Sequence, residues 1–423
     1  MTKSSFFIYQ LFFCFFFFTV SSNSQTRSCG MVEYMNQQMQ DPVFAREYQE
    51  TQTRFRAALA QKLSANGTNS NRRTTLVIPV AVHFPEALES DRACLEALAQ
   101  NQIDILNADF TATNSDANLW SAASTFYPST NHGVANIEFR IATQNHPTNL
   151  DAELLEGSPA VTIGYNFGNG NEYEYDDNWS GYMNFVVKDI GPDTLGSSPL
   201  GGSISFGDTV LMNLDTFGSG AGCSDSGVIP REFFNLGRTV THELGHFFNL
   251  DHPWGGDGGC DMDDGITDTP NISNSSQGCP SNGSVDGCIS GEKALTMNYM
   301  DYANDACMFM FTEGQITVAE AYLDTIEADF KTNVLSVQSE LFEAFSVFPN
   351  PNKGSFNVKF QSASSEDVMI TVFDIRGRKI YSNTFKTNRN FNQTINLDSA
   401  QSGVYLMTVS NGRDQLTKRV IIN

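Results

Sequence analysis

The segment HELGHFFNLDH, residues 242–252, contains the most informative pattern of this chain. On a helix, His242 and His246 lie one turn apart on the same face, so both imidazoles can reach one ion. His252 comes six residues after His246 and would point away from that ion if the helix continued. The helix must therefore end, and Asn249 marks where, because asparagine adopts the left-handed conformation that ends helices more readily than other residues except glycine.

Three neutral imidazoles with an open fourth position are typical of a catalytic zinc site, since structural zinc sites are closed by four protein ligands. Glu243 follows the first histidine and can reach the attacking water without being a ligand, as a general base does. The alternative is a helix with histidines on its surface, but three of the chain's six histidines fall within these 11 residues. The stretch predicts hydrolysis that depends on one catalytic zinc ion, held by His242, His246 and His252.

Residues 242–252 resemble the extended zinc motif of the metzincin metallopeptidases, which usually have glycine where this chain has Asn249. The segment NYMDY, residues 298–302, is similar to the Met-turn of one metzincin family, the pappalysins. The resemblance implies that Met300 lies beneath the zinc and that Tyr302 stabilises the transition state. An ordinary core methionine is the alternative for Met300. Protein or peptide substrates are implied as well.

The resemblance covers residues 74–335 and implies an α+β metzincin-type catalytic domain, with a twisted sheet and its helices over an irregular lower subdomain. Strand and helix patterns alternate up to the histidine cluster, whereas residues 255–291 contain no long periodic element. Thr312, with Gln315 three residues later, predicts the start of a helix that runs to about residue 330. The other expected elements are strands at 76–83, 135–142, 183–187 and 209–212, and helices at 44–63 and 94–110.

Residues 1–24 have the pattern of a secretory signal peptide, with an apolar run from residue 6 to residue 20. A membrane anchor is the alternative, but a spanning helix needs about 20 apolar residues. Residues 25–73 are polar and end in two arginines, which predicts a removable pro-segment; a small helical subdomain is the alternative. We therefore expect a secreted protein without stable membrane insertion.

The chain is acidic, with a formal net charge of −23, and this makes nucleic acid an unsuitable partner because nucleic acid binds basic patches. Four of its carboxylates fall within eight residues of the segment CDMDDGITDTP, residues 260–270. Calcium prefers such oxygen ligands on a flexible loop, although a solvated acidic loop is the alternative. The resemblance to pappalysins implies structural calcium, with Asp264, Thr267 and Thr269 as ligands.

Eight cysteines are present, and removal of the signal peptide leaves seven, an odd number in an oxidising compartment. Cys29 begins the pro-segment, and its thiolate could occupy the zinc position that the catalytic water needs. Similar cysteines keep metzincin zymogens latent; a disulfide from Cys29 to Cys94 or Cys223 is the alternative. The family resemblance also implies two disulfides, Cys260–Cys288 and Cys279–Cys307.

After an expected linker at 336–345, residues 346–423 have short alternating strands separated by glycine turns. Three segments in this region, FPNPNKGSF (348–356), DIRG (374–377) and SGVYL (402–406), resemble the C-terminal sorting domain of the type IX secretion system. That resemblance implies a small all-β sandwich and a partner in the outer-membrane export machinery. It also implies passage through the periplasm to the medium or the cell surface. A carbohydrate- or matrix-binding sandwich is the alternative.

Asp305 lies five residues after Met300, in a segment that metzincins use as a wall of the pocket for the residue after the scissile bond. A carboxylate buried there needs a cationic partner, and the resemblance implies cleavage before Arg or Lys. Alternatively, Asp305 faces solvent or supports the calcium loop.

Two other functions remain open for the whole protein. One is a non-catalytic adhesin with structural zinc, which the presence of Glu243 and the lack of an adjoining fourth ligand argue against. The other is a metallo-amidase for non-protein amides, which only the Met-turn argues against.

Overall fold

The computed structural model of this chain describes residues 29–64, 75–147, 150–170, 175–256, 258–335, 343–361, 367–374, 376, 378–386, 390–397, 400–410 and 415–423. The expected signal peptide and the two arginines at the end of the expected pro-segment lie outside these residues. Among the described helices, none has both the length and the apolar character that a membrane crossing requires.

A six-stranded sheet forms the centre of the region before residue 336, in the order β2-β1-β4-β6-β5, with β3 also paired to β1. Its first strand, β1 (Leu76–Phe84), is buried along almost its whole length, as expected for a parallel strand covered on both faces. Only the short edge strand β5 runs antiparallel to its neighbour. The remaining strands are β2 (Ile137–Ile141), β3 (Val161–Ile163), β4 (Met183–Lys188), β5 (Gly196–Ser197) and β6 (Thr209–Asn213).

Two helices, α3 (Arg92–Phe110) and α5 (Arg238–Phe247), pack on the sheet and on each other. Phe110 ends α3 and joins these layers: its ring centroid lies 5.5 Å from that of Phe139 on β2 and 5.8 Å from that of Phe248 after α5. The predicted helix at 94–110 is thereby confirmed. Helix α5 is fully buried and contains the first two histidines of the motif.

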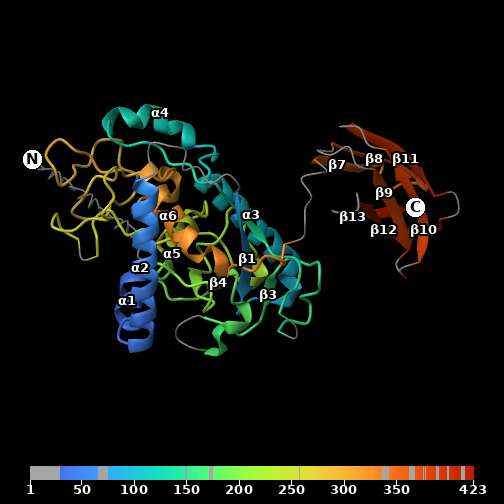
Figure 1. Cartoon of the computed structure of the whole chain (residues 1–423), viewed down its shortest axis with the longest axis horizontal. Helices are drawn as coiled ribbons and strands as arrows, with labels where there is room; N and C mark the ends of the chain where they lie inside the picture. Colours follow the sequence, from blue (N-terminus) through green and yellow to red (C-terminus); the bar gives the residue numbers. More distant parts are fainter. Residues whose placement is uncertain are drawn as a thin grey trace, which may run out of the picture.

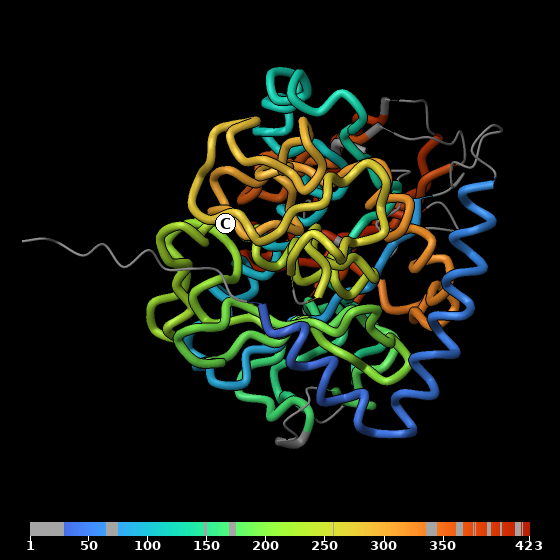
Figure 2. Tube along the Cα trace, turned by 90° about the vertical axis from the view of Figure 1, so that its left-hand side faces the viewer, coloured from blue at the N-terminus to red at the C-terminus, as the bar shows by residue number. Residues whose placement is uncertain are grey.

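Helix α2 (Pro42–Ser64) packs along α6 (Glu313–Ile326), as Figure 1 shows. The Phe55 ring centroid lies 5.7 Å from that of Tyr322 on α6, and Figure 2 shows α2 on the outer side of the molecule, in blue. The predicted cap of α6 is confirmed, because Thr312 and Gln315 form a reciprocal capping box. Two shorter helices are α1 (Met31–Gln38) and α4 (Trp120–Ala123). Short 3-10 segments are Glu89–Asp91, Ala117–Leu119, Ser124–Phe126, Phe167–Gly170, Asp177–Trp179, Ser224–Ser226, Asp305–Cys307 and Glu327–Asp329.

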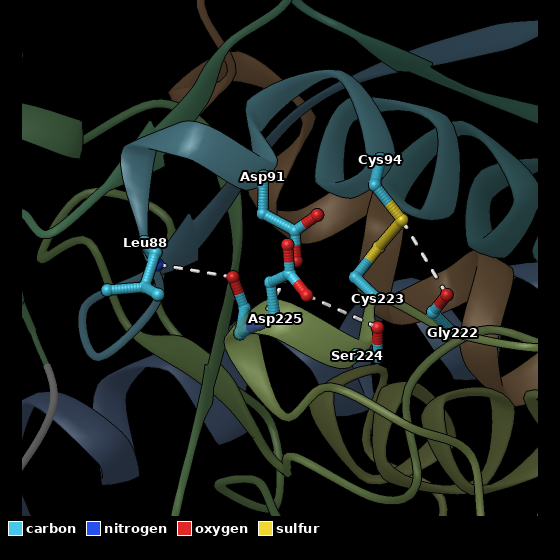
Figure 3. The surroundings of a disulfide bond; sticks show 8 residues. Leu88, Asp91, Cys94, Gly222, Cys223, Ser224 and Asp225 are labelled. Carbon is cyan, nitrogen blue, oxygen red and sulfur yellow. Dashed lines mark hydrogen bonds between the residues drawn. A yellow bond between two sulfur atoms is a disulfide. The ribbon is translucent and has the colours of Figure 1, made fainter.

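The residues between α5 and α6 form the irregular subdomain that was expected from the sequence. Two disulfides cross-link it, Cys260–Cys288 and Cys279–Cys307. A third disulfide, Cys94–Cys223, ties α3 to the loop after β6 (Figure 3). Around it, Leu88 N donates to Ser226 Oγ at 3.2 Å, and Ser226 N donates to Asp91 Oδ2 at 3.0 Å. Cys29 is thus not disulfide-bonded, and it is buried.

The C-terminal residues form two antiparallel sheets, one in the order β10-β9-β12-β13 and the other in the order β11-β8-β7. Apolar side chains from both sheets share one core, so the predicted all-β sandwich is confirmed. The strands are β7 (Glu343–Phe348), β8 (Ser355–Gln361), β9 (Val368–Asp374), β10 (Lys379–Phe385), β11 (Asn390–Asn396), β12 (Gly403–Ser410) and β13 (Gln415–Ile422).

Candidate metal centre

The three predicted histidine ligands meet at one point. The Nε2 atoms of His242, His246 and His252 form a triangle with sides of 3.2, 3.1 and 3.3 Å. A tetrahedral zinc ion with nitrogen ligands at about 2.0–2.1 Å holds those nitrogens about 3.3–3.4 Å apart. Three imidazole nitrogens brought this close without a shared ligand would direct their lone pairs at one another, so the residues present fit a zinc ion.

The turn after α5 brings the third histidine back to the first two. Asn249 has φ +68°, the left-handed conformation expected from the sequence, and Leu250 N donates to Gly245 O at 3.0 Å. His246 Nδ1 donates to Leu250 O at 2.7 Å, and His242 Nδ1 donates to Tyr299 O at 2.7 Å. These bonds place the proton of each ring on Nδ1, so Nε2 is the nitrogen that can bind a metal.

The electrostatics of the site also suit metal binding. Burial lowers the pKa of His246 to about 4, and burial together with the neighbouring His246 lowers the pKa of His252 well below its usual range. Both rings are therefore neutral at pH 7, which is the form that binds zinc.

Glu243 and Cys29 lie together beside the histidines. Cys29 Sγ donates to Glu243 Oε2 at 3.3 Å, and the ligand atoms of Cys29 and the three histidines all lie within 4.8 Å of one another. The backbone next to Cys29 pairs with the edge strand β5, where Gly30 N donates to Gly196 O at 3.0 Å. Gly196 itself has to be small, because a Cβ there would stand 2.7 Å from Glu243 Cγ.

Met300 and Tyr302 approach the centre from the lower part of the domain. Met300 is buried against α5, where Gly245 leaves the room that the methionine sulfur occupies. The Tyr302 ring centroid lies 5.5 Å from that of His242 and 5.1 Å from that of His252. Both residues thus lie next to the histidines.

Asp305 takes a position that sequence reasoning did not foresee. It is fully buried, so the solvent-facing alternative is wrong. Its Oδ2 accepts from Leu236 N at 2.9 Å and from Arg238 N at 3.2 Å, and Arg238 is the first residue of α5. Asp305 therefore caps the positive end of the helix that carries the zinc motif.

The acidic segment contains two different environments. Asp268 accepts from Thr312 Oγ1 at 2.7 Å and from Gly314 N at 2.9 Å, so it caps α6. Asp264, in contrast, has a buried Oδ2 without a hydrogen bond of ordinary geometry to any described residue, and burial raises its pKa to about 8. Thr267 and Thr269 line a neighbouring cavity of about 240 Å³. An unpaired, buried carboxylate oxygen fits a cation such as calcium.

Sequence reasoning missed a buried network under α5. Arg238 Nη1 pairs with Asp109 Oδ1 at 2.9 Å and also contacts the Tyr299 hydroxyl, while Thr241 Oγ1 donates to Asp109 Oδ2 at 2.7 Å. Tyr299 O is the acceptor for His242, so the network ties the first ligand to α3. Arg238, at the first position of this fully buried helix, could have indicated the network, because a buried charge requires a partner.

Comparison with known proteins agrees with these features. Residues 231–324 match the family described as pregnancy-associated plasma protein-A, and residues 346–423 match the family described as secretion system C-terminal sorting domain. An extracellular metalloprotease of Verticillium alfalfae is 30% identical over 264 residues, which is 61% of this chain and 82% of that protein. An extracellular metalloprotease of Arthroderma otae is 42% identical over 101 residues. That match covers 23% of this chain and 37% of the relative, and the chain spans about a third of the length of the first curated relatives.

A solved structure of a promirolysin variant from Tannerella forsythia is similar to this one, with a TM-score of 0.53 and 28% sequence identity. The match covers 71% of this chain and 94% of that chain. The histidine triangle, the Met-turn and these relatives agree with one another. The chain therefore belongs to the pappalysin family of metallopeptidases, and residues 346–423 form a C-terminal sorting domain for type IX secretion.

Proposed function

We propose that this protein is a secreted zinc endopeptidase that is made as a latent precursor. The observation that carries the proposal is the triangle of Nε2 atoms with sides of 3.1–3.3 Å, beside which lies a carboxylate that is not part of the triangle. A structural zinc in an adhesin would need a fourth ligand from the mature protein, whereas the fourth group here, Cys29, comes from the expected pro-segment.

His242, His246 and His252 would hold the zinc ion, which would serve as a Lewis acid toward the scissile carbonyl and would lower the pKa of water. Glu243 takes the proton from the attacking water and later gives it to the leaving amine. The Tyr302 hydroxyl donates a hydrogen bond to the oxyanion of the tetrahedral intermediate. Buried surroundings favour each of these steps, because Glu243 is 1% exposed and electrostatic interactions strengthen where water is excluded.

Latency rests on two contacts of the pro-segment. Cys29 Sγ lies within 4.8 Å of the ligand nitrogens of the three histidines, and Gly30 pairs with β5, the strand next to Glu243. Farther along, Gln52 Nε2 donates to Asn249 Oδ1 at 2.6 Å, which joins α2 to the turn between the second and third ligands. The residue that departs from the usual family glycine is thus one of those that the pro-segment contacts.

For specificity we propose cleavage before Arg or Lys, with Asp305 supplying the negative charge. Support comes from its complete burial at the start of α5, the helix that carries His242 and His246. Since its Oδ2 also caps α5, replacing Asp305 would alter the helix as well as the pocket. The cleaner measurement compares Arg, Lys and Leu substrates in the unaltered enzyme, and equal rates for the three would contradict the proposal.

We further propose structural calcium at Asp264, Thr267 and Thr269, supported by the burial of Asp264 Oδ2. The proposed route of export is the type IX machinery of the outer membrane, reached through the periplasm. That route leaves the enzyme in the medium or on the cell surface.

The proposed function is tested by replacing Glu243 with alanine. Because Glu243 is the base and not a ligand, the variant should lose peptide hydrolysis and keep one zinc ion per chain, measured by metal analysis of the processed protein. Loss of zinc would contradict this role for Glu243. The other informative result is a processed parent protein that holds zinc and yet cleaves neither unfolded protein nor peptides. That result would favour the metallo-amidase if the protein cleaves small amides, and the adhesin if it does not.

A further inference from the structure

The third histidine ligand is covered by an aromatic ring. The indole of Trp254 lies on the imidazole of His252 with ring centroids 4.4 Å apart and an angle of 6° between the planes. Local sequence explains this arrangement. Residues 252–255 read HPWG, and Gly255 N donates to His252 O at 2.9 Å, which closes a tight turn. Proline second and glycine fourth are favoured in such turns, and this turn folds Trp254 back over His252.

His252 differs from His242 and His246 in the contact that holds its ring in place. His242 and His246 each donate from Nδ1 to a backbone carbonyl at 2.7 Å. His252 Nδ1 is buried and has no hydrogen-bond partner among the residues that the structure describes. Asp251 Oδ1 is 4.0 Å from this atom and instead accepts from His252 N at 2.7 Å. At His252, stacking against Trp254 therefore takes the place of the hydrogen bond that normally orients a ligand histidine.

The stack is held rigidly by its surroundings. Tyr302 meets both rings edge-on, with centroids 5.1 Å from His252 and 4.9 Å from Trp254. Behind the indole, Trp254 packs into a small buried cluster with Ile272 and Ala294. The indole can therefore restrict rotation of the imidazole instead of moving with it.

We propose that Trp254 is a positioning residue, which orients His252 for the metal by ring stacking in place of a hydrogen bond; the inference rests on the proposed function. A metal-bound imidazole shares the positive charge of the ion, and the indole face attracts positive charge. The stack therefore stabilises the metal-bound form more than the metal-free form. Loss of an outer partner of a metal ligand typically weakens metal binding about 10- to 100-fold.

The test measures zinc binding directly in the full chain carrying Glu243→Gln, so that self-cleavage does not interfere. Trp254→Leu should raise the zinc Kd about 10-fold or more in competition with a chelator, and should change the visible spectrum of the cobalt-substituted protein. Trp254→Phe keeps a flat ring and should have a smaller effect. The matched control is Trp120→Leu, because Trp120 stacks on Tyr127 at 6.0 Å in a separate cluster and should leave the zinc Kd unchanged.

An unchanged zinc Kd and cobalt spectrum in Trp254→Leu would overturn the inference. If that variant does not fold, indole fluorescence decides. The change in emission on adding zinc to the parent should disappear in Trp254→Phe and persist in Trp120→Phe; its persistence in Trp254→Phe would also overturn the inference. Because zinc affinity is measured without any substrate, the two ideas fail separately: a processed enzyme with Glu243 intact that binds zinc but cleaves no peptide contradicts the proposed function alone.

Discussion

Replacing Cys29 with alanine is expected to raise the activity of the uncut precursor about 100-fold. The Cys29 sulfur lies 3.3 Å from Glu243 Oε2 and binds zinc only as a thiolate, so the hydrogen bond of the thiol does not add to the zinc bond. A zinc ion with four protein ligands contributes about 10–16 kcal/mol to folding, hence roughly 3–4 kcal/mol per ligand. Displacing the water that would otherwise fill this position offsets part of this free energy. About 3 kcal/mol remains, and each 1.4 kcal/mol is about a factor of ten.

The assay measures initial rates on an internally quenched peptide, while mass spectrometry verifies that the pro-segment is still attached. Cys29→Ser is the matched control, because its hydroxyl keeps the hydrogen bond to Glu243 but is a poor zinc ligand; its rate should fall between those of the parent and the alanine variant. The reasoning is refuted if the alanine precursor is as slow as the parent while the processed enzyme is active. Latency would then come from the backbone pairing at Gly30 and from α2, not from the thiol.

Three further outcomes are expected. Tyr302→Phe should lower kcat about 100-fold with little change in KM or zinc content, and an unchanged kcat would remove the hydroxyl from the mechanism. Gln52→Ala removes the 2.6 Å bond to Asn249, which contributes about 1 kcal/mol, so self-processing should be about fivefold faster; an unaltered processing rate would contradict this. Burial raises the pKa of Asp264 from 3.8 to about 8, so calcium must displace a proton, and calcium affinity should rise with pH and level off near pH 8. The calcium-free protein should lose stability as the pH increases over the same range. Calorimetry that finds a pH-independent calcium affinity would contradict the assignment.

Much of the fold could be predicted from local patterns. The apolar run of β1, the amphipathic α3 and the Thr312 cap of α6 each reflect a period or a cap that neighbouring residues determine. The acidic segment could not be interpreted in the same way. Asp268 caps α6, a helix that begins 45 residues later in the chain, so its role depends on a contact that no local pattern records. The burial of Asp305 against the start of α5 likewise depends on how the Met-turn segment packs.

The set of candidate metal ligands could be predicted from local sequence. Helical spacing puts His242 and His246 on one face, and the left-handed preference of Asn249, observed at φ +68°, returns His252 to them. What surrounds these histidines depends on tertiary packing. Cys29 reaches Glu243 across 214 residues because Gly30 pairs with the edge of the sheet, and Trp254 covers His252 because a turn and a buried cluster hold it there. Helix periodicity is a property of adjacent residues, whereas burial and packing depend on segments that the chain brings together only on folding.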